Sequence, residues 1–188
     1  MTIIELLVVI IIIFILAGLV LSISSYVQNK GARARAETEI AAMSAALESY
    51  KADNGIYPST ANTVSLTSAQ PDPTSSAYKT ASLDLYKALS GDLDANLSTD
   101  ANQKSYFDFK KQMLYGPRDP NGNLTSVSYI RDPFGPVANP NSYGYSTSKN
   151  PMANPTNYST APGNNPTFDL WSTASDTSGA TAKWIKNW

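Results

Sequence analysis

The sequence predicts an α+β fold in which a long N-terminal α-helix carries a small antiparallel β-sheet domain on its C-terminal half. Two observations lead to this prediction. Residues 3–23 are almost entirely apolar, and apolar residues keep recurring at helical spacing up to an Asn-Gly-x-x-Pro stop at residues 54–58. Behind that stop the chain is polar, and its strand-like segments are short and bounded by turn-forming residues.

The apolar run from residue 3 to residue 23 is interrupted by Glu5 and two small residues. About 20 helical residues reach across a bilayer core of roughly 30 Å, so we predict a transmembrane segment within a hydrophobic half-helix at residues 1–25. A secretory signal peptide would require basic residues ahead of a shorter apolar run, and the first basic residue is Lys30. A simple membrane anchor explains the length of the run but leaves Glu5 unexplained.

Glu5 is the unusual residue of this segment. A carboxylate inside an apolar helix costs about 2.5–3.5 kcal/mol on membrane-insertion scales, so we expect it to have a partner and a function. The α-amino group of Met1 lies about one helical turn away in the same chain. The amino group of a neighbouring chain is an alternative partner, and pairing between chains would fix the stagger of parallel helices.

The helix is predicted to continue through an amphipathic half at residues 26–55. Its apolar stripe consists of Ala36, Ile40, Met43, Leu47 and Tyr50, whose spacing of three and four residues is helical. Charged residues lie mostly off the stripe, as on a solvated helix face. Because the first half is apolar all round, only this second half is suited to packing against a domain.

Residues 56–188 are predicted to form the polar domain, with a loop-rich insertion at about residues 59–128. Within it, residues 59–79 are expected to be a loop and residues 82–89 a short helix. The best strand candidates are residues 127–130, 142–146 and 167–172.

Composition restricts the function. The 188-residue chain has 14 Lys and Arg against 15 Asp and Glu, so no basic surface for nucleic acid is indicated. It contains no His and no Cys, which excludes disulfides, thiolate chemistry and His-based catalysis or zinc binding. The sequence also lacks a nucleophile motif and a phosphate loop, and we therefore expect no enzyme activity.

Residues 2–10 closely resemble the N-terminal signature of mature type IV pilins and type II secretion pseudopilins. The resemblance implies the type IV pilin fold and removal of a short basic leader by a prepilin peptidase. It also implies that Met1 is the N-methylated first residue and that Glu5 guides assembly. On this reading the sequence starts at the processed end.

Further segments resemble the major pseudopilin of type II secretion. The pattern Tyr-Lys-x-Asp-Asn-Gly-x-Tyr-Pro ends the helix at residues 50–58, and an Asp-Pro-aromatic-Gly turn occupies residues 132–135. A Phe-Asp-Leu-aromatic-Ser strand at residues 168–172 and the ending Asn187-Trp188 complete the resemblance. About 70 residues between residue 58 and residue 129 look like an insertion relative to that family.

That family commonly binds calcium in the loop behind its last strand. Asp176 matches the first acidic residue of the loop, but Lys183 and Trp184 stand where later acidic residues are usual. Calcium prefers carboxylate-rich oxygen sites, which a lysine opposes. We expect no cofactor, with calcium at Asp176 as the alternative, and hypothesise that Lys183 pairs with Asp176 in place of the ion.

Three Asn-x-Ser/Thr sequons are candidate glycosylation sites, namely Asn96, Asn123 and Asn157. Such triplets also arise by chance in a chain this rich in Asn, Ser and Thr.

Together these observations predict a structural subunit, the major pilin of an extracellular filament made of copies of itself. The subunit would wait in the cytoplasmic membrane and be assembled by a pilus or type II secretion platform. The first alternative is the major pseudopilin of a periplasmic type II secretion pseudopilus. The second is a monomeric membrane-anchored binding protein.

Overall fold

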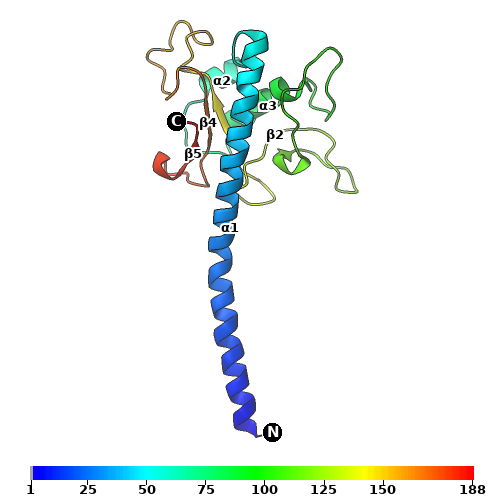
Figure 1. The fold of residues 1–188 in the computed structure, drawn as a ribbon, viewed down its shortest axis with the longest axis vertical. Coiled ribbons are helices and arrows are strands. Elements are labelled where there is room, and N and C mark those ends of the chain that lie inside the picture. Colours follow the sequence, from blue (N-terminus) through cyan, green and yellow to red (C-terminus); the bar gives the residue numbers. More distant parts are fainter. Residues whose placement is uncertain (1) are drawn as a thin grey trace.

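Helix α1 (Ile3–Asn54) is the long axis of the molecule and extends over 52 residues (Figure 1). The computed structural model describes residues 2–188, without the side chains of residues 19–25. The helix ends as predicted, because Gly55 takes a left-handed conformation with φ 79° and donates its N–H to the Lys51 carbonyl at 2.7 Å. A glycine tolerates this backbone conformation at no steric cost.

The C-terminal domain combines two helices with two small antiparallel sheets, which confirms the predicted α+β class. Its helices are α2 (Ala61–Ser65) and α3 (Ser76–Ser90). One sheet pairs β1 (Leu114–Tyr115) with β2 (Tyr129–Ile130). The other has the order β3 (Gly144–Ser146), β4 (Asp169–Ser172), β5 (Ile185–Lys186). Short 3-10 turns at Lys111–Met113 and Thr181–Lys183 precede β1 and β5.

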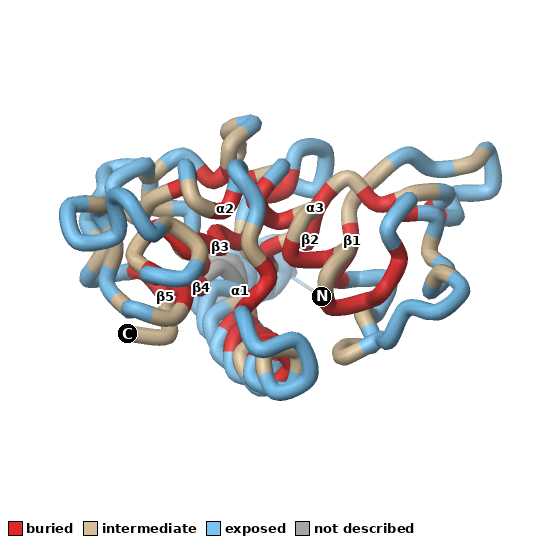
Figure 2. The backbone as a smooth tube through the Cα atoms, turned by 90° about the horizontal axis from the view of Figure 1, so that it is seen from above, coloured by how far each residue is buried: buried red, intermediate tan, exposed pale blue. Residues whose placement is uncertain are grey.

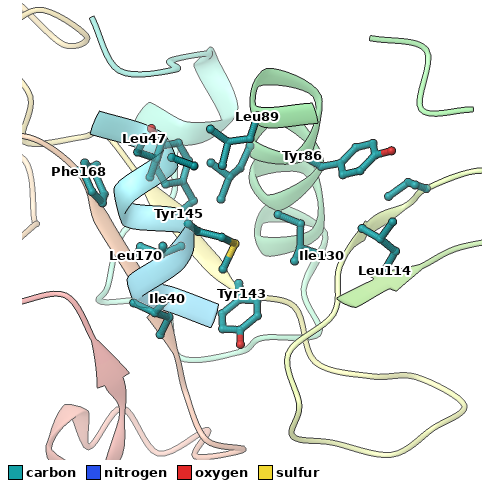
Figure 3. Packing of buried hydrophobic residues seen from close by; sticks show 14 of the residues in the cluster. Ile40, Leu47, Tyr86, Leu89, Leu114, Ile130, Tyr143, Tyr145, Phe168 and Leu170 are labelled. Carbon is teal, nitrogen blue, oxygen red and sulfur yellow. The ribbon is translucent and has the colours of Figure 1, made fainter. Parts of the chain in front are cut away.

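The domain packs on the second half of α1 only. Viewed from above, α1 lies at one edge, with β3, β4 and β5 on one side of it and β1 and β2 on the other (Figure 2). Ile40 and Leu47 of α1 pack into a cluster with Tyr145 and Leu170 from the three-stranded sheet and with Tyr143, the residue ahead of β3 (Figure 3). The buried apolar positions of α1 are Ala36, Ile40, Met43, Ala46 and Leu47. They follow the predicted stripe except at its end, where Tyr50 is only half-buried.

The segment expected to be a loop at residues 59–79 differs from the prediction. It contains α2 and the first turn of α3, so the helix predicted at residues 82–89 begins at Ser76. The reason is tertiary packing: Tyr78 and Ala81 are fully buried in a second cluster with Trp171. Tyr78 and Ala81 extend the apolar face of α3 at helical spacing, but their contact with Trp171 joins segments far apart in the sequence and has no local signature.

The strands are shorter than the sequence indicated. Only the last two residues of the candidate at 127–130 belong to a strand, because the Val127 N–H bonds to the Ala95 carbonyl instead of a sheet neighbour. Strand β5 was not predicted. It has two residues and is held in register by the pairs Trp171–Lys186 and Ser172–Ile185.

Candidate assembly site

The first half of α1 extends away from the domain and is surrounded by no other element (Figure 1). Every large apolar side chain from Ile3 to Leu16 is exposed, with exposed fractions from 43% at Ile10 to 89% at Ile3. Soluble monomers rarely leave an apolar surface of this extent open, and such surfaces mark sites of association. This half-helix is therefore the main candidate binding surface of the chain.

Within the part of the chain whose side chains are described, no helix carries an apolar stretch of the length that crossing a membrane requires. The span predicted over residues 3–23 includes residues 19–23, which lie outside that part.

Glu5 lies on the exposed half-helix, in its first turn. Its Oε2 accepts the backbone N–H of Thr2 at 2.7 Å, so the carboxylate caps the start of its own helix. In the first turn of α1 a carboxylate also interacts favourably with the helix dipole. Met1 lies outside the described residues, and its pairing with Glu5 stays a prediction.

The second half of α1 is fixed to the domain by polar contacts as well as by its apolar stripe. Glu39 is buried, and its Oε1 accepts from Arg35 Nε at 2.6 Å. Its Oε2 accepts from the Tyr143 hydroxyl at 2.7 Å. Arg33 donates to the Lys183 carbonyl at 3.1 Å, which attaches the C-terminal loop to the helix. The domain is therefore held at one defined height on α1, and the apolar half stays free.

Comparison with known families adds one finding. Residues 25–92 match the family model of type II secretion system (T2SS), protein G. The match covers less than half of the 188 residues. It supports a relation to the pilin-like proteins, of which protein G is the major pseudopilin. No curated protein and no solved structure shows significant similarity to the chain.

The protein G-like segment, residues 25–92, contains the docked half of α1 together with α2 and α3. It therefore includes the first part of the stretch that the sequence indicated as an insertion. The buried side chains of α3 fit this finding, since Leu85 and Leu89 belong to the same core cluster as Leu47 of α1. Glu5 and the exposed half-helix lie ahead of the matched segment.

The C-terminal loop brings Asp176 and Lys183 together. Lys183 Nζ lies 3.7 Å from Asp176 Oδ2, with the lysine side chain 73% exposed and the aspartate side chain 9% exposed. The other oxygen, Oδ1, accepts the Ser178 N–H at 2.8 Å, and hydrogen bonds from Ser178 lower the pKa of Asp176 more than Lys183 does. An ammonium at this carboxylate does not fit a divalent cation there. The role of the pair stays a hypothesis.

The three sequons lie in different local settings. The Asn96 amide nitrogen donates to Asp94 at 2.8 Å, and that of Asn123 donates to Asp119 at 3.1 Å. Asn157 is exposed in the loop between β3 and β4. Glycosylation at these positions stays a prediction.

Two carboxylate clusters were missed by sequence reasoning. Carboxylate oxygens of Asp92, Asp94 and Asp100 lie within 4.8 Å of one another. Asp92 is buried, and it accepts from the Tyr86 hydroxyl at 2.6 Å and from the Leu97 N–H at 2.7 Å, so it fastens the end of α3 to the following loop. The other is the pair of Glu39 and Asp132: burial raises the pKa of Asp132, and the charge of Glu39 raises it further. Because Glu39 and Asp132 are far apart in the sequence, no sequence pattern indicated that they lie near each other.

Proposed function

We propose that the chain is a structural subunit of a type IV pilin-like filament and, more specifically, the major pseudopilin of a type II secretion system. The similarity of residues 25–92 to protein G of that system is the observation that carries this proposal. It favours the pseudopilus over the extracellular pilus, which the sequence had placed first.

The geometry of α1 supports assembly through the N-terminal helix. The half-helix from Ile3 to Leu16 exposes its apolar side chains on all sides, and burial of such area is favourable by about 25 cal/mol per Å². Before assembly this surface would lie in the cytoplasmic membrane. In the filament it would pack against the same half-helix of other copies, with the polar domains outside and the filament in the periplasm.

In this proposal Glu5 and Met1 set the axial offset between neighbouring copies. Glu5 would exchange its contact with the Thr2 N–H for the N-methylated amino group of a neighbouring copy. A carboxylate without a partner inside an apolar helix bundle is unfavourable. Only the stagger that pairs Glu5 with an amino group avoids this, so the carboxylate selects one axial offset between the helices. A prepilin peptidase and the type II secretion assembly platform would be the other partners.

An extracellular pilus is the second candidate. It is favoured by the long polar loop between β3 and β4, which is rich in Asn, Pro, Ser and Thr and largely exposed. Such a loop would suit a filament surface that contacts the medium.

A gene deletion in the organism that makes the protein separates the candidates. We expect the deletion to abolish export of type II substrates, and the wild-type gene to restore it. Glu5→Ala should fail to restore export while reaching the same level in the membrane. Normal export with loss of long surface fibres would favour the pilus instead. Normal export with normal fibres would leave the monomeric membrane-anchored binding protein.

A further inference from the structure

A groove of about 810 Å³ lies where α1 leaves the domain (Figure 1). One wall consists of α1 residues within 26–33. The other wall comes from the turn at residues 133–135 and from residues 174–175 and 182–183 of the C-terminal segment. The lining includes the cations Lys30, Arg33 and Lys183, and among the residues that the structure describes it includes no aspartate or glutamate. Such a lining favours an anionic ligand.

Two carboxylates outside the lining lie near these cations and leave them available. Asp176 Oδ2 is 3.7 Å from Lys183 Nζ, beyond hydrogen-bond distance, and the lysine side chain is 73% exposed. Glu37 Oε1 is 3.5 Å from Arg33 Nε, and both side chains are about half exposed. Lys30 forms no ion pair with any described side chain. Because exposed ion pairs contribute little in water, a ligand phosphate can compete with both carboxylates.

The position of the groove along α1 corresponds to the surface of a membrane. With Glu5 at one edge of the hydrocarbon core, about 20 helical residues cross the roughly 30 Å core, and the helix emerges near Tyr26. Tyr26 is 61% exposed, and tyrosine is enriched at membrane–water interfaces. Its ring lies 5.0 Å from Lys30 Nζ, which is thereby placed at the level of the lipid headgroups. Residues 6–36 contain three basic side chains and no acidic one.

We propose that the groove binds the phosphate headgroup of an anionic phospholipid while the subunit is in the membrane. Lys30, Arg33 and Lys183 would hold the phosphate, as basic clusters beside transmembrane helices do. The acyl chains would continue along the apolar half-helix. A lipid is favoured over an acidic segment of a second copy, because the groove and the apolar half-helix follow each other along α1 as headgroup and acyl chain do in a lipid. The inference rests on the proposed function for the membrane residence of the free subunit.

The test follows the backbone amides of the ¹⁵N-labelled full chain by NMR in micelles of a neutral detergent. The micelles are titrated with dicaproyl phosphatidylglycerol, with dicaproyl phosphatidylcholine or with inorganic phosphate. Phosphatidylglycerol should give saturable shifts at the amides that line the groove, and the other two compounds should not. Equal shifts with phosphatidylcholine would overturn the preference for an anionic lipid. Equal shifts with inorganic phosphate would show a site for the free ion and would overturn the lipid.

A pair of lysine variants tests the groove itself. Lys30→Gln should weaken the binding of phosphatidylglycerol about fivefold, which is the contribution of one basic side chain near an anionic lipid surface. Lys110 is exposed and lies outside the groove, so Lys110→Gln is the matched control and should bind as the wild type does. Near-ultraviolet circular dichroism checks that both variants keep the fold. Equal affinities of the two variants would overturn the proposal.

One further outcome would also overturn it. Shifts at the groove that depend on protein concentration and not on lipid would show that a second copy occupies the groove. None of these readouts depends on secretion, so the two proposals can fail separately. Lipid binding by a chain whose deletion leaves export normal would reject the proposed function alone. A chain that is required for export but binds no anionic lipid would reject the lipid site alone.

Discussion

The Tyr143 hydroxyl donates a hydrogen bond of 2.7 Å to Glu39 Oε2 and thereby joins the start of β3 to the middle of α1. Both side chains are buried, and Arg35 holds the other Glu39 oxygen. A carboxylate removed from water needs all its hydrogen bonds, so this contact is specific as well as stabilising. It fixes the height at which the domain is attached to α1, and so defines how much of the helix stays free for assembly.

Removal of that hydroxyl should destabilise the fold. In Tyr143→Phe the Glu39 oxygen stays buried without its donor, and we expect a loss of about 1–3 kcal/mol in the free energy of unfolding. Chemical denaturation of the full chain in detergent measures it. Tyr158→Phe is the control, since Tyr158 is 40% exposed, and should change stability by less than about 0.5 kcal/mol. Equal stability of the two variants would show that the Glu39 contact is unimportant.

The apolar stripe of α1 should be the main energetic contact with the domain. Leu47 is 0% exposed, and Leu47→Ala should cost about 2–5 kcal/mol through lost burial and the cavity that remains. Leu93, which is 50% exposed, supplies the control Leu93→Ala. Thermal unfolding followed by near-ultraviolet circular dichroism reports the difference. A Leu47→Ala variant as stable as the control would mean that the stripe does not pack as the structure places it.

Gly144 is required by a close approach to Trp171. A Cβ at this position would lie 2.3 Å from a ring atom of Trp171, which is itself fully buried and cannot move aside. We expect Gly144→Ala to destabilise the three-stranded sheet by about 1–3 kcal/mol or more. Gly31→Ala is the opposite case. A Cβ at Gly31 would meet nothing within 4 Å, and alanine favours an α-helix over glycine, so the free energy of unfolding should rise by up to about 1 kcal/mol. Unfolding midpoints in urea compare the two.

The Lys183–Asp176 pair predicts the response to calcium. If the ammonium occupies the place of a cation, adding calcium or a chelator should leave the wild-type melting temperature unchanged. Lys183→Asp would add a carboxylate to the loop and should make the melting temperature rise with calcium. Lys183→Met, which removes the charge without adding a ligand, is the control and should show no rise. A rise in the wild-type melting temperature on adding calcium would refute the hypothesis that Lys183 takes the place of the ion.

Much of α1 could be predicted because its signals are local. The spacing from Ala36 to Leu47 and the Asn54-Gly55 stop depend only on neighbouring residues, and the structure confirms them. The domain was predicted less well, because its elements are short and stabilised by distant contacts. Tyr78 is buried by Trp171 and donates to the Gln70 carbonyl at 2.6 Å, and neither contact has a signature in the sequence around α3.

The candidate sites also differ in whether local sequence reveals them. Glu5 is visible in the sequence because its surroundings are uniformly apolar, and a charge is conspicuous there. Asp132 was noticed only as part of a turn. Its burial and the effect of the Glu39 charge on it arise from contacts between segments far apart in the sequence, which no local pattern encodes.

Photo-crosslinking from Phe14 tests most directly whether the free half of α1 binds other copies of the chain. Phe14 is 73% exposed on that half, so a photoreactive phenylalanine analogue placed there would contact whatever covers it. In intact cells the account predicts a ladder of multimers whose crosslinked peptide comes from α1 of a second copy, and predicts that Glu5→Ala abolishes the ladder. Crosslinks to lipid alone, or a ladder unchanged by Glu5→Ala, would contradict it.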